Sequence, residues 1–312
     1  MKNNLATFHR LFSAVMLLCL LLLPLPAPAS GADTAKYHRI VLLGDPHLPG
    51  KHLDKKEQVR ETINTWNDVD LAVALGDICQ DRGTADEFVA AARFFSGLNK
   101  PFLPIPGNHD VGYEDETSMK GKRVRVSDDN VRTAKLERFR SVFGLPALYQ
   151  SRQMGGYLLL FLATDSSGHL TEMSDTQLFW LDEELGRNPS LPAIVFFHAP
   201  LEGTLPPYNA KVNEPDYIAQ PARQIAELTD RHPNLLLWVS GHTHTTPKLP
   251  GFISPLNRYR DRITNIHTPD LNRSHIWTRS LFLYPDRVVI KTWDHTIGIW
   301  LPELEETVLL PR

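Results

Sequence analysis

The sequence has very little cysteine, and this scarcity narrows the class of protein. Only Cys19 and Cys79 occur among 312 residues. Cys19 lies in an N-terminal apolar segment that we expect to be removed, so one thiol would remain and no intrachain disulfide could form. The chain is therefore unlike small secreted domains held together by disulfides. Its fold must depend on a hydrophobic core and on any bound metal.

The sequence also lacks an excess of positive charge. The formal net charge is −3 at pH 7, and removal of residues 1–29 would take away Lys2 and Arg10 but no acidic residue. The mature chain would thus be mildly acidic. A polyanion such as DNA selects a broad basic face, so we expect no polymeric nucleic acid as a partner. Small phosphate-bearing molecules are compatible with this charge.

The N-terminal segment predicts export. Basic residues precede an apolar run from Leu17 to Leu23, and prolines and small residues follow as far as Ala29. The run is shorter than the roughly 20 residues that span a bilayer, and Cys19 lacks the small residues of a lipid-attachment site. We expect a signal peptide at residues 1–29, a periplasmic or secreted protein, no stable membrane anchor after cleavage, and one domain at residues 30–312. The oligomeric state stays open.

Five apolar runs recur along the remaining chain, and each ends in a turn that carries a possible metal ligand. They are residues 39–43, 71–75, 102–105, 193–197 and 235–239. Each run is typical of a buried strand. The spacing Ser/Thr-x-x-Glu/Gln at residues 84–87 and 174–177 predicts capping boxes at the starts of two amphipathic helices. Strands that alternate with helices indicate an α/β fold with largely parallel pairing.

Irregular sequence follows several of the polar turns. The longest such stretches are residues 111–126, 201–215 and 245–272, and we expect them to form loops around the mouth of a site. Near the C-terminus, two alternating runs within residues 276–293 predict an antiparallel hairpin added to a sheet edge.

The polar turns together supply carboxylate, imidazole and amide side chains without a thiolate. The candidate ligands are Asp45, His47, Asp77, Asn108, His198, His242 and His244. Such a donor set suits Mn, Zn or Fe. Seven side chains are too many for one ion, but they suit two metals roughly 3.5–4 Å apart that share one bridging carboxylate. Asp77 is our candidate for the bridge, although spacing alone does not prove it.

Each candidate ligand also has an ordinary structural explanation. A single histidine after a strand is more often a capping or surface residue, and Gly107-Asn108 is a common turn dipeptide. The joint pattern of Asp-x-His, His-x-His and three further polar turns at equivalent places favours a metal centre over independent turns. Gly107 would let the backbone turn sharply beneath the metals.

These motifs resemble those of the calcineurin-like metallophosphoesterase superfamily, and the resemblance spans residues 38–244. It rests on Asp-x-His at 45–47, Gly-Asp at 76–77, Gly-Asn-His-Asp at 107–110, His-x-Pro at 198–200 and Gly-His-x-His at 241–244. The resemblance implies a four-layer α/β/β/α sandwich of two mixed sheets, with the site at the carboxyl ends of the strands.

The same resemblance implies roles for individual residues. One metal would be bound by Asp45, His47, Asp77 and His244. The other would be bound by Asp77, Asn108, His198 and His242. His109 would lie near the leaving group, with Asp110 as its partner. The alternative for His109 is a structural histidine outside the chemistry.

The middle of the chain narrows the resemblance to class III cyclic-nucleotide and glycerophosphodiester phosphodiesterases. This rests on residues 76–81, 139–149, 157–161, 165–166 and 177–181. Two departures matter. Ala199 stands where the cyclic-nucleotide enzymes have a second histidine, which weakens that narrower assignment. Gln80 stands where purple acid phosphatases place a metal-binding tyrosine, so we expect no strictly ferric site. The two ions could be divalent or mixed-valence Mn, Fe or Zn.

The sequence therefore predicts an exported dinuclear-metal hydrolase of phosphate esters, with small phosphodiesters as the expected substrates. Metal-activated hydroxide would attack phosphorus, and His109, if protonated and hydrogen-bonded to Asp110, would donate a proton to the leaving group. A phosphomonoesterase and a non-catalytic metal-binding scaffold are the alternatives. The basic segments 120–125 and 258–262 either attract phosphate or are simply solvated, and the sequence does not decide between these roles.

Overall fold

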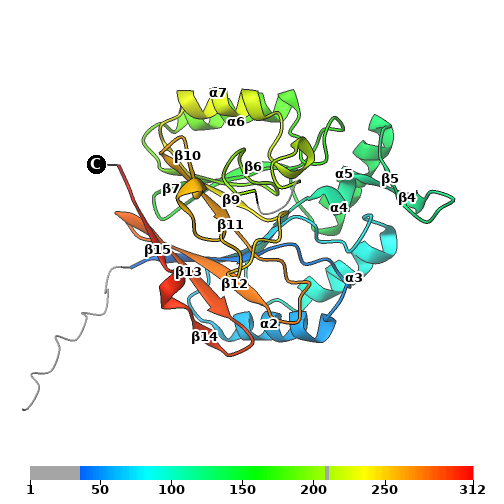
Figure 1. Ribbon diagram of the computed structural model, residues 1–312, viewed down its shortest axis with the longest axis horizontal. Helices are drawn as coiled ribbons and strands as arrows, with labels where there is room; N and C mark the ends of the chain where they lie inside the picture. Colours follow the sequence, from blue (N-terminus) through cyan, green and yellow to red (C-terminus); the bar gives the residue numbers. More distant parts are fainter. Residues whose placement is uncertain (1–35, 208–210, 312) are drawn as a thin grey trace, which may run out of the picture. The chain divides into compact units, whose positions relative to one another are not determined.

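The five apolar runs form strands of two mixed β-sheets (Figure 1). The computed structural model describes residues 36–207 and 211–311, and contacts unite Tyr37–Arg312 into one unit. The signal peptide predicted at residues 1–29 lies outside the described residues. Within the described ranges, no helix combines the length and the apolar character needed to cross a membrane.

The first sheet has seven strands. In spatial order they are β14 (Ile299–Trp300), β13 (Arg287–Asp294), β12 (Trp277–Leu283), β1 (His38–Leu43), β2 (Leu71–Leu75) and β3 (Phe102–Ile105), with β15 (Glu306–Leu309) also paired to β13. Strands β1, β2 and β3 run parallel, whereas β12 pairs antiparallel with both β1 and β13. The hairpin β12–β13 covers the range predicted at the C-terminus, and β14 and β15 extend the sheet beyond it.

The second sheet has six strands. Their spatial order is β10 (Arg258–Tyr259), β11 (Ile263–His267), β9 (Leu235–Ser240), β8 (Ala193–Phe196), β7 (Tyr157–Phe161) and β6 (Gln150–Met154). Strand β11 pairs parallel with β9, although it lies in the stretch predicted to be irregular. That prediction was wrong because β11 buries polar residues, Thr264, Asn265 and His267, which interrupt the apolar run.

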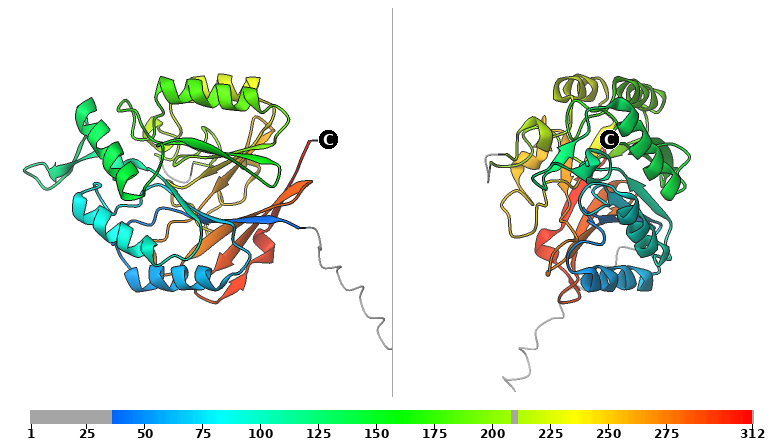
Figure 2. Two further views of the ribbon diagram at one scale, coloured as in Figure 1. Left: turned by 180° about the vertical axis from the view of Figure 1, so that it is seen from behind. Right: turned by 90° about the vertical axis from the view of Figure 1, so that its right-hand side faces the viewer.

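The two sheets pack face to face, and helices cover their outer faces (Figures 1 and 2). A cluster of side chains from both sheets forms the inner core. Helices α2 (Leu53–Thr65), α3 (Ala85–Ser96) and α5 (Asp129–Val142) pack on the first sheet, and α6 (Asp175–Arg187) and α7 (Ala222–Arg231) pack on the second. The predicted four-layer α/β/β/α sandwich is confirmed.

Strand β1 shows why these runs are apolar throughout. Ile40 and Leu42 enter the core between the sheets, whereas Val41 and Leu43 pack against the helix layer. Successive side chains of a strand point to opposite faces, so a strand covered on both faces must be apolar at every position. The polar turns that follow such strands therefore interrupt the apolar sequence abruptly.

The two predicted capping boxes have different outcomes. At Thr84 the box is complete, with the Glu87 side chain accepting from the Thr84 backbone N–H at 3.0 Å. At Ser174 only half forms, because the Gln177 side chain instead bonds the backbone of Ala163. The buried Gln177 amide thus pairs with both the N–H and the C=O of Ala163, and it does not return to the Ser174 backbone as a capping box requires.

Short elements fill the connections between the main layers. They are α4 (Asn108–Val111), β4 (Tyr113–Thr117), β5 (Arg123–Arg125), η1 (Pro215–Tyr217), η2 (Pro255–Asn257) and η3 (Pro302–Leu304). Strands β4 and β5 form a hairpin that projects beside α5 (Figure 1). The stretch 111–126, predicted as an irregular loop, is thus mainly this hairpin.

Candidate metal centre

The seven candidate ligands converge where the parallel strands of both sheets end. Asp45 and His47 follow β1, Asp77 follows β2, and Asn108 follows β3. His198 follows β8, and the pair His242 and His244 follows β9. Parallel strands bring their carboxyl ends to the same edge, so residues far apart in sequence meet there.

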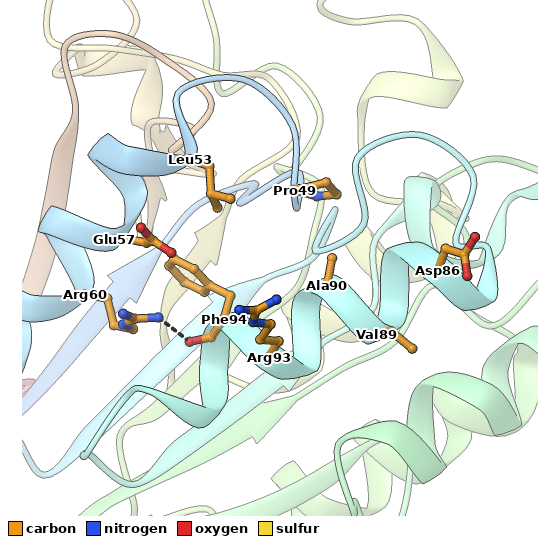
Figure 3. Close-up of a pocket in the computed structure, with 9 residues that line it drawn as sticks. All are labelled: Pro49, Leu53, Glu57, Arg60, Asp86, Val89, Ala90, Arg93 and Phe94. Carbon is orange, nitrogen blue, oxygen red and sulfur yellow. Dashed lines mark hydrogen bonds between the residues drawn. The ribbon is translucent and has the colours of Figure 1, made fainter.

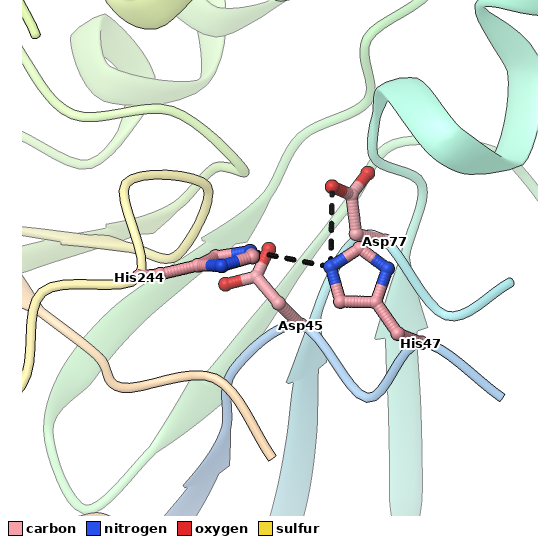
Figure 4. Close-up of side chains that lie close together, drawn as sticks. All are labelled: Asp45, His47, Asp77 and His244. Carbon is pink, nitrogen blue, oxygen red and sulfur yellow. Dashed lines mark hydrogen bonds and ion pairs between the residues drawn. The ribbon is translucent and has the colours of Figure 1, made fainter. Parts of the chain in front are cut away.

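The first group consists of Asp45, His47, Asp77 and His244, whose ligand atoms all lie within 4.8 Å of one another (Figure 4). His47 Nε2 lies 3.2 Å from His244 Nε2 and 4.0 Å from Asp77 Oδ2. Two ring nitrogens and two carboxylates thus face one point, which is an arrangement that a cation can occupy and that apolar packing would not produce.

The second group consists of Asp77, His198 and His242, and the Asn108 amide lies beside it. His198 Nε2 is 3.0 Å from Asn108 Oδ1, 3.2 Å from Asp77 Oδ1 and 3.0 Å from His242 Nδ1. Asp77 belongs to both groups. The donor set therefore fits two ions that share one carboxylate, in the same two groups that the resemblance implied.

Main-chain carbonyls orient three of the imidazoles. Leu75 O lies 2.7 Å from His198 Nδ1, Gln80 O lies 3.2 Å from His47 Nδ1, and Asp216 O lies 2.9 Å from His242 Nε2. A carbonyl oxygen only accepts, so the ring nitrogen facing it carries the proton. In the neutral form of each ring, the other nitrogen turns a lone pair toward the cluster, as a metal ligand requires.

The backbone of the ligand turns is strained. Five of the candidate ligands adopt left-handed φ angles, which are Asp45 (38°), His47 (46°), Asp77 (49°), His242 (63°) and His244 (50°). Such conformations cost on the order of 1–3 kcal/mol each outside glycine and persist where the surroundings enforce them. Their concentration at this one site indicates that the turns are shaped to direct side chains inward.

Gly107 is required for space and not for a left-handed turn. Its φ of −110° is accessible to any residue. A Cβ at Gly107, however, would lie 2.3 Å from the Asp77 backbone nitrogen and 2.5 Å from Asp77 Oδ1. We expected a sharp turn at this glycine. Its role is instead to let the β3 turn approach the shared carboxylate closely.

Burial and mutual charge set the protonation of the cluster. Burial lowers the pKa of His47 to about 4 and that of His242 to about 3. Burial also disfavours the charged form of His198, but the Asp77 and Asp45 carboxylates outweigh it and raise the pKa of His198 to about 9. Without a cation, His198 therefore favours its charged form between the two carboxylates, at a place suited to positive charge.

The two cluster carboxylates differ in pKa. Burial, together with the charges of Asp77 and Asp270, raises the pKa of Asp45 well above its ordinary value. Burial acts on Asp77 in the same direction, but His198 and His109 overcome it and hold the pKa of Asp77 well below the ordinary value. Asp77 is thus the anionic centre of the cluster, which suits a bridging ligand.

Asp110 does not contact the His109 imidazole, so the expected partnership between the two is wrong. The Asp110 carboxylate accepts backbone N–H bonds from Cys79 at 2.8 Å, Gly107 at 2.8 Å and Ile78 at 3.2 Å. Consecutive residues of a helix point in different directions, and in α4 Asp110 turns into the protein. It ties the β2 turn to the β3 turn.

The His109 imidazole instead faces the metal cluster and the β4–β5 hairpin. Its Nε2 lies 3.8 Å from Asp77 Oδ2 and 2.8 Å from Arg123 Nη1. The His109 backbone N–H donates to Asp77 Oδ1 at 2.7 Å. The histidine is thereby fixed to the shared carboxylate through its main chain, while its ring lies at the edge of the site.

A cavity of about 480 Å³ opens over the cluster. Asp77, His242 and His244 line its metal side, and His109, Tyr113, Arg123 and Tyr217 are among the residues that line the rest. The basic segment 120–125 thus contributes Arg123 to the cavity. The segment 258–262 does not line it, since Arg262 bonds backbone carbonyls near α7.

A larger cavity of about 670 Å³ lies between α2 and α3 (Figure 3). Leu53, Val89 and Phe94 line it together with Arg60, which donates to Phe94 O at 3.0 Å. None of the candidate ligands lines it. The chemistry of the lining, and not the volume, identifies the cavity over the cluster as the candidate site.

Sequence reasoning missed Asp270, which supports the first group. Its Oδ2 lies 3.8 Å from His244 Nδ1, and it is also paired with Arg273, whose Nη2 donates to His244 O at 3.1 Å. Asp270 follows β11 as the other polar residues follow their strands. Recognition of β11 as a strand would have revealed it.

Comparison with known proteins identifies the class that this fold and site define. The calcineurin-like phosphoesterase family profile matches residues 38–246. The chain belongs to the calcineurin-like phosphoesterase family, which confirms the resemblance found in the sequence. Members of this family use a dinuclear metal centre, in agreement with the two ligand groups.

Two curated relatives are glycerophosphodiester phosphodiesterases. The probable enzyme GpdQ of Arcobacter nitrofigilis is 24% identical over 178 residues, and GpdQ of Enterobacter lignolyticus is 28% identical over 179 residues. Each match covers 56% of this chain and 56% of the relative, so the chain spans about half the length of these relatives. They belong to one of the two groups that the middle of the sequence resembles.

Solved structures share the fold at low sequence identity. A dimetal phosphatase from Danio rerio has a TM-score of 0.57 at 13% identity, covering 88% of this chain and 99% of that chain. Purple acid phosphatase PPD1 from yellow lupin seeds has a TM-score of 0.59 at 13% identity, covering 88% of this chain and 54% of that chain. GAP50, an anchor in the inner membrane complex of Plasmodium, has a TM-score of 0.50 at 11% identity, covering 88% and 90%.

Proposed function

We propose that this protein hydrolyses small phosphodiesters at a dinuclear metal centre. One observation carries the proposal: two ligand groups share Asp77 at the base of a cavity that has a histidine and an arginine on its other side. Asp45, His47, Asp77 and His244 would hold one ion, and Asp77, Asn108, His198 and His242 the other. When bound, the ions supply charge neutralisation for phosphoryl oxygens and acidify water, so that hydroxide is available near neutral pH.

His109 acts at the leaving group in this proposal. Its ring lies at the cavity, and its main chain is fixed to Asp77 at 2.7 Å. An imidazole so placed can donate a proton to the departing alkoxide. Asp110 contributes indirectly, because its three backbone hydrogen bonds hold the turns that carry Asp77 and His109.

The preference for diesters is supported by the names of the GpdQ relatives, which act on glycerophosphodiesters. A phosphomonoesterase of the same fold is the second candidate, since the fold is shared with the dimetal phosphatase. A non-catalytic scaffold is the third, because GAP50 is described as an anchor. Residues 1–29 lead us to propose export as well, which cell fractionation and N-terminal sequencing of the mature protein would test.

Hydrolysis assays separate these candidates. Purified protein is stripped of metal, resupplied with Mn, Zn or Fe, and offered bis(para-nitrophenyl) phosphate, para-nitrophenyl phosphate and cyclic nucleotides. We expect metal to restore hydrolysis, with a higher kcat/KM for a diester. A higher kcat/KM for the monoester would overturn the diester preference alone. Bound metal without hydrolysis of any ester would favour the scaffold and reject the enzyme.

A further inference from the structure

Arg123 occupies an unusual position in the candidate site. It lies on β5, outside both sheets of the sandwich, yet its guanidinium reaches the His109 ring, with Nη1 at 2.8 Å from Nε2 and 3.2 Å from Nδ1. It also lines the cavity over the metal cluster. The sequence left open whether the basic segment 120–125, to which Arg123 belongs, attracts phosphate or is solvated.

The contact with His109 conflicts with the proposed role of that histidine. A guanidinium only donates hydrogen bonds, so the ring nitrogen that faces it must accept. A nitrogen that accepts from Arg123 cannot at the same time donate a proton to a leaving oxygen. Because Nη1 lies within 3.2 Å of both ring nitrogens, Arg123 covers the two atoms of the imidazole that could donate to a leaving oxygen.

The remaining contacts of Arg123 leave it free to move. Its side chain is 40% exposed, whereas that of Asp77 is 3% exposed. Arg123 Nε lies 3.6 Å from Asp81 Oδ1 in an exposed ion pair, and its guanidinium stacks over Tyr113 at 4.7 Å. Exposed ion pairs contribute little, and a stacked guanidinium keeps its donors available. An anionic phosphate oxygen is a stronger acceptor for a guanidinium than an imidazole nitrogen is.

We propose that Arg123 binds the phosphate group of the substrate and, in moving to it, releases the ring nitrogens of His109 for the leaving oxygen. The inference rests on the proposed function, since it requires that the site hydrolyse phosphate esters. Arg123 would have two effects on the reaction. Arg123 contributes affinity for the phosphate, and it makes His109 accessible only when a phosphate is present.

The hairpin that carries Arg123 is held by the rest of the protein, which keeps the arginine within reach. Arg125 on the same strand pairs with Asp216 at 3.1 Å. On the paired strand, Asp115 contacts Arg138 at 3.0 Å, and Lys135 also binds Asp115. The base of the hairpin is thus anchored on both strands, and the movement required is that of one side chain.

The test compares Arg123→Ala and Arg123→Lys with Lys122→Ala, a control that removes a neighbouring exposed cation of the same hairpin. Inorganic phosphate is the probe, used as a competitive inhibitor of the metal-loaded proteins, and metal content is measured in each. We expect Arg123→Ala to raise the inhibition constant about tenfold or more, as for a lost charge-assisted hydrogen bond. Arg123→Lys should recover part of this loss, and Lys122→Ala should stay within about twofold of the wild type.

Diesters with aryl and with alkyl leaving groups provide the second measurement. If Arg123 binds the phosphate, Arg123→Ala lowers kcat/KM for both diesters. An unchanged inhibition constant for phosphate in a variant with full metal content would overturn the proposal, and so would a loss confined to the alkyl diester. An inactive wild type would instead reject the proposed function, so the two failures are distinguishable.

Discussion

The metal side and the substrate side of the cavity are built in different ways. On the metal side, five of the seven candidate ligands are buried, backbone angles are strained, and main-chain carbonyls orient His47, His198 and His242. On the substrate side, His109 and Arg123 are partly exposed, with side chains 17% and 40% accessible, and they contact each other through side chains alone. The sandwich thus fixes the candidate metal ligands, while a hairpin outside it carries the proposed substrate contact.

The two sides of the cavity therefore differ in how strongly the surrounding structure determines the positions of their side chains. Strained, buried turns resist change because the surrounding strands determine them. A hairpin side chain in solvent can move without disturbing the core. We therefore expect substitutions on the metal side to abolish metal binding and substitutions on the substrate side to leave the metals in place.

The largest effect is expected for Asp77→Ala. Asp77 is the one described residue that belongs to both ligand groups, so its loss should remove both ions and lower kcat on the order of 10³-fold or more. Metal analysis and phosphodiester hydrolysis on the same sample measure this. Asp54→Ala, which removes an exposed carboxylate of α2, serves as the control. An Asp77→Ala protein that keeps two ions would contradict the claim that both ligand groups depend on Asp77.

His109→Ala tests the substrate side. Metal content should stay at the wild-type level, because His109 is not among the residues that form either group. We expect kcat to fall on the order of 10²-fold, and to fall further for diesters with a poor leaving group, as for removal of a general acid. Equal turnover of an alkyl diester by the variant and the wild type would remove His109 from the mechanism.

Asp270→Asn should weaken metal binding without changing the cavity. The carboxylate lies 3.8 Å from His244 Nδ1 and also binds Arg273. Loss of such a supporting carboxylate commonly reduces affinity by about 10-fold or more. Equilibrium titration with Mn measures the effect. Asp294→Asn is a matched control, because Asp294 is also a buried carboxylate but lies at the end of β13, outside both ligand groups. An unchanged affinity would mean that His244 needs no such support.

Metal uptake should release protons, and this is the smallest of the expected effects. Burial opposes a charged His198, but neighbouring carboxylates raise its pKa to about 9, so it is protonated at about pH 7.5. A metal ligand must be a neutral imidazole, so binding expels about one proton or more, and affinity should fall as the pH drops below about 9. Calorimetry in buffers of different ionisation enthalpy measures the release. An ordinary histidine would release only about a tenth of a proton.

The sequence was sufficient to predict the metal side because one rule generates it. An apolar strand buried on both faces must stop where the chain leaves the sheet, and the polar residue after that stop is conspicuous. Asp45, Asp77 and His198 all follow this rule. Asp270 was not predicted, because β11, the strand that precedes it, was not recognised. Buried polar residues such as Asn265 interrupt the apolar pattern of β11.

The side-chain contacts on the substrate side could not be predicted, because they depend on three-dimensional packing. The partnership between His109 and Asp110 was implied by the family resemblance, but α4 turns their side chains in different directions. The contact of Arg123 with His109 depends on the register of a two-stranded hairpin in a stretch without strong apolar alternation. Sequence spacing carries no information about such a contact.

One titration tests the central claim most directly. Metal-free protein is given Mn in increments, and bound metal and phosphodiester hydrolysis are measured on each sample. The account predicts that hydrolysis reaches its maximum when two ions are bound per chain, because two ligand groups share Asp77. Maximal hydrolysis with one ion bound per chain, or hydrolysis that persists with none, would contradict it.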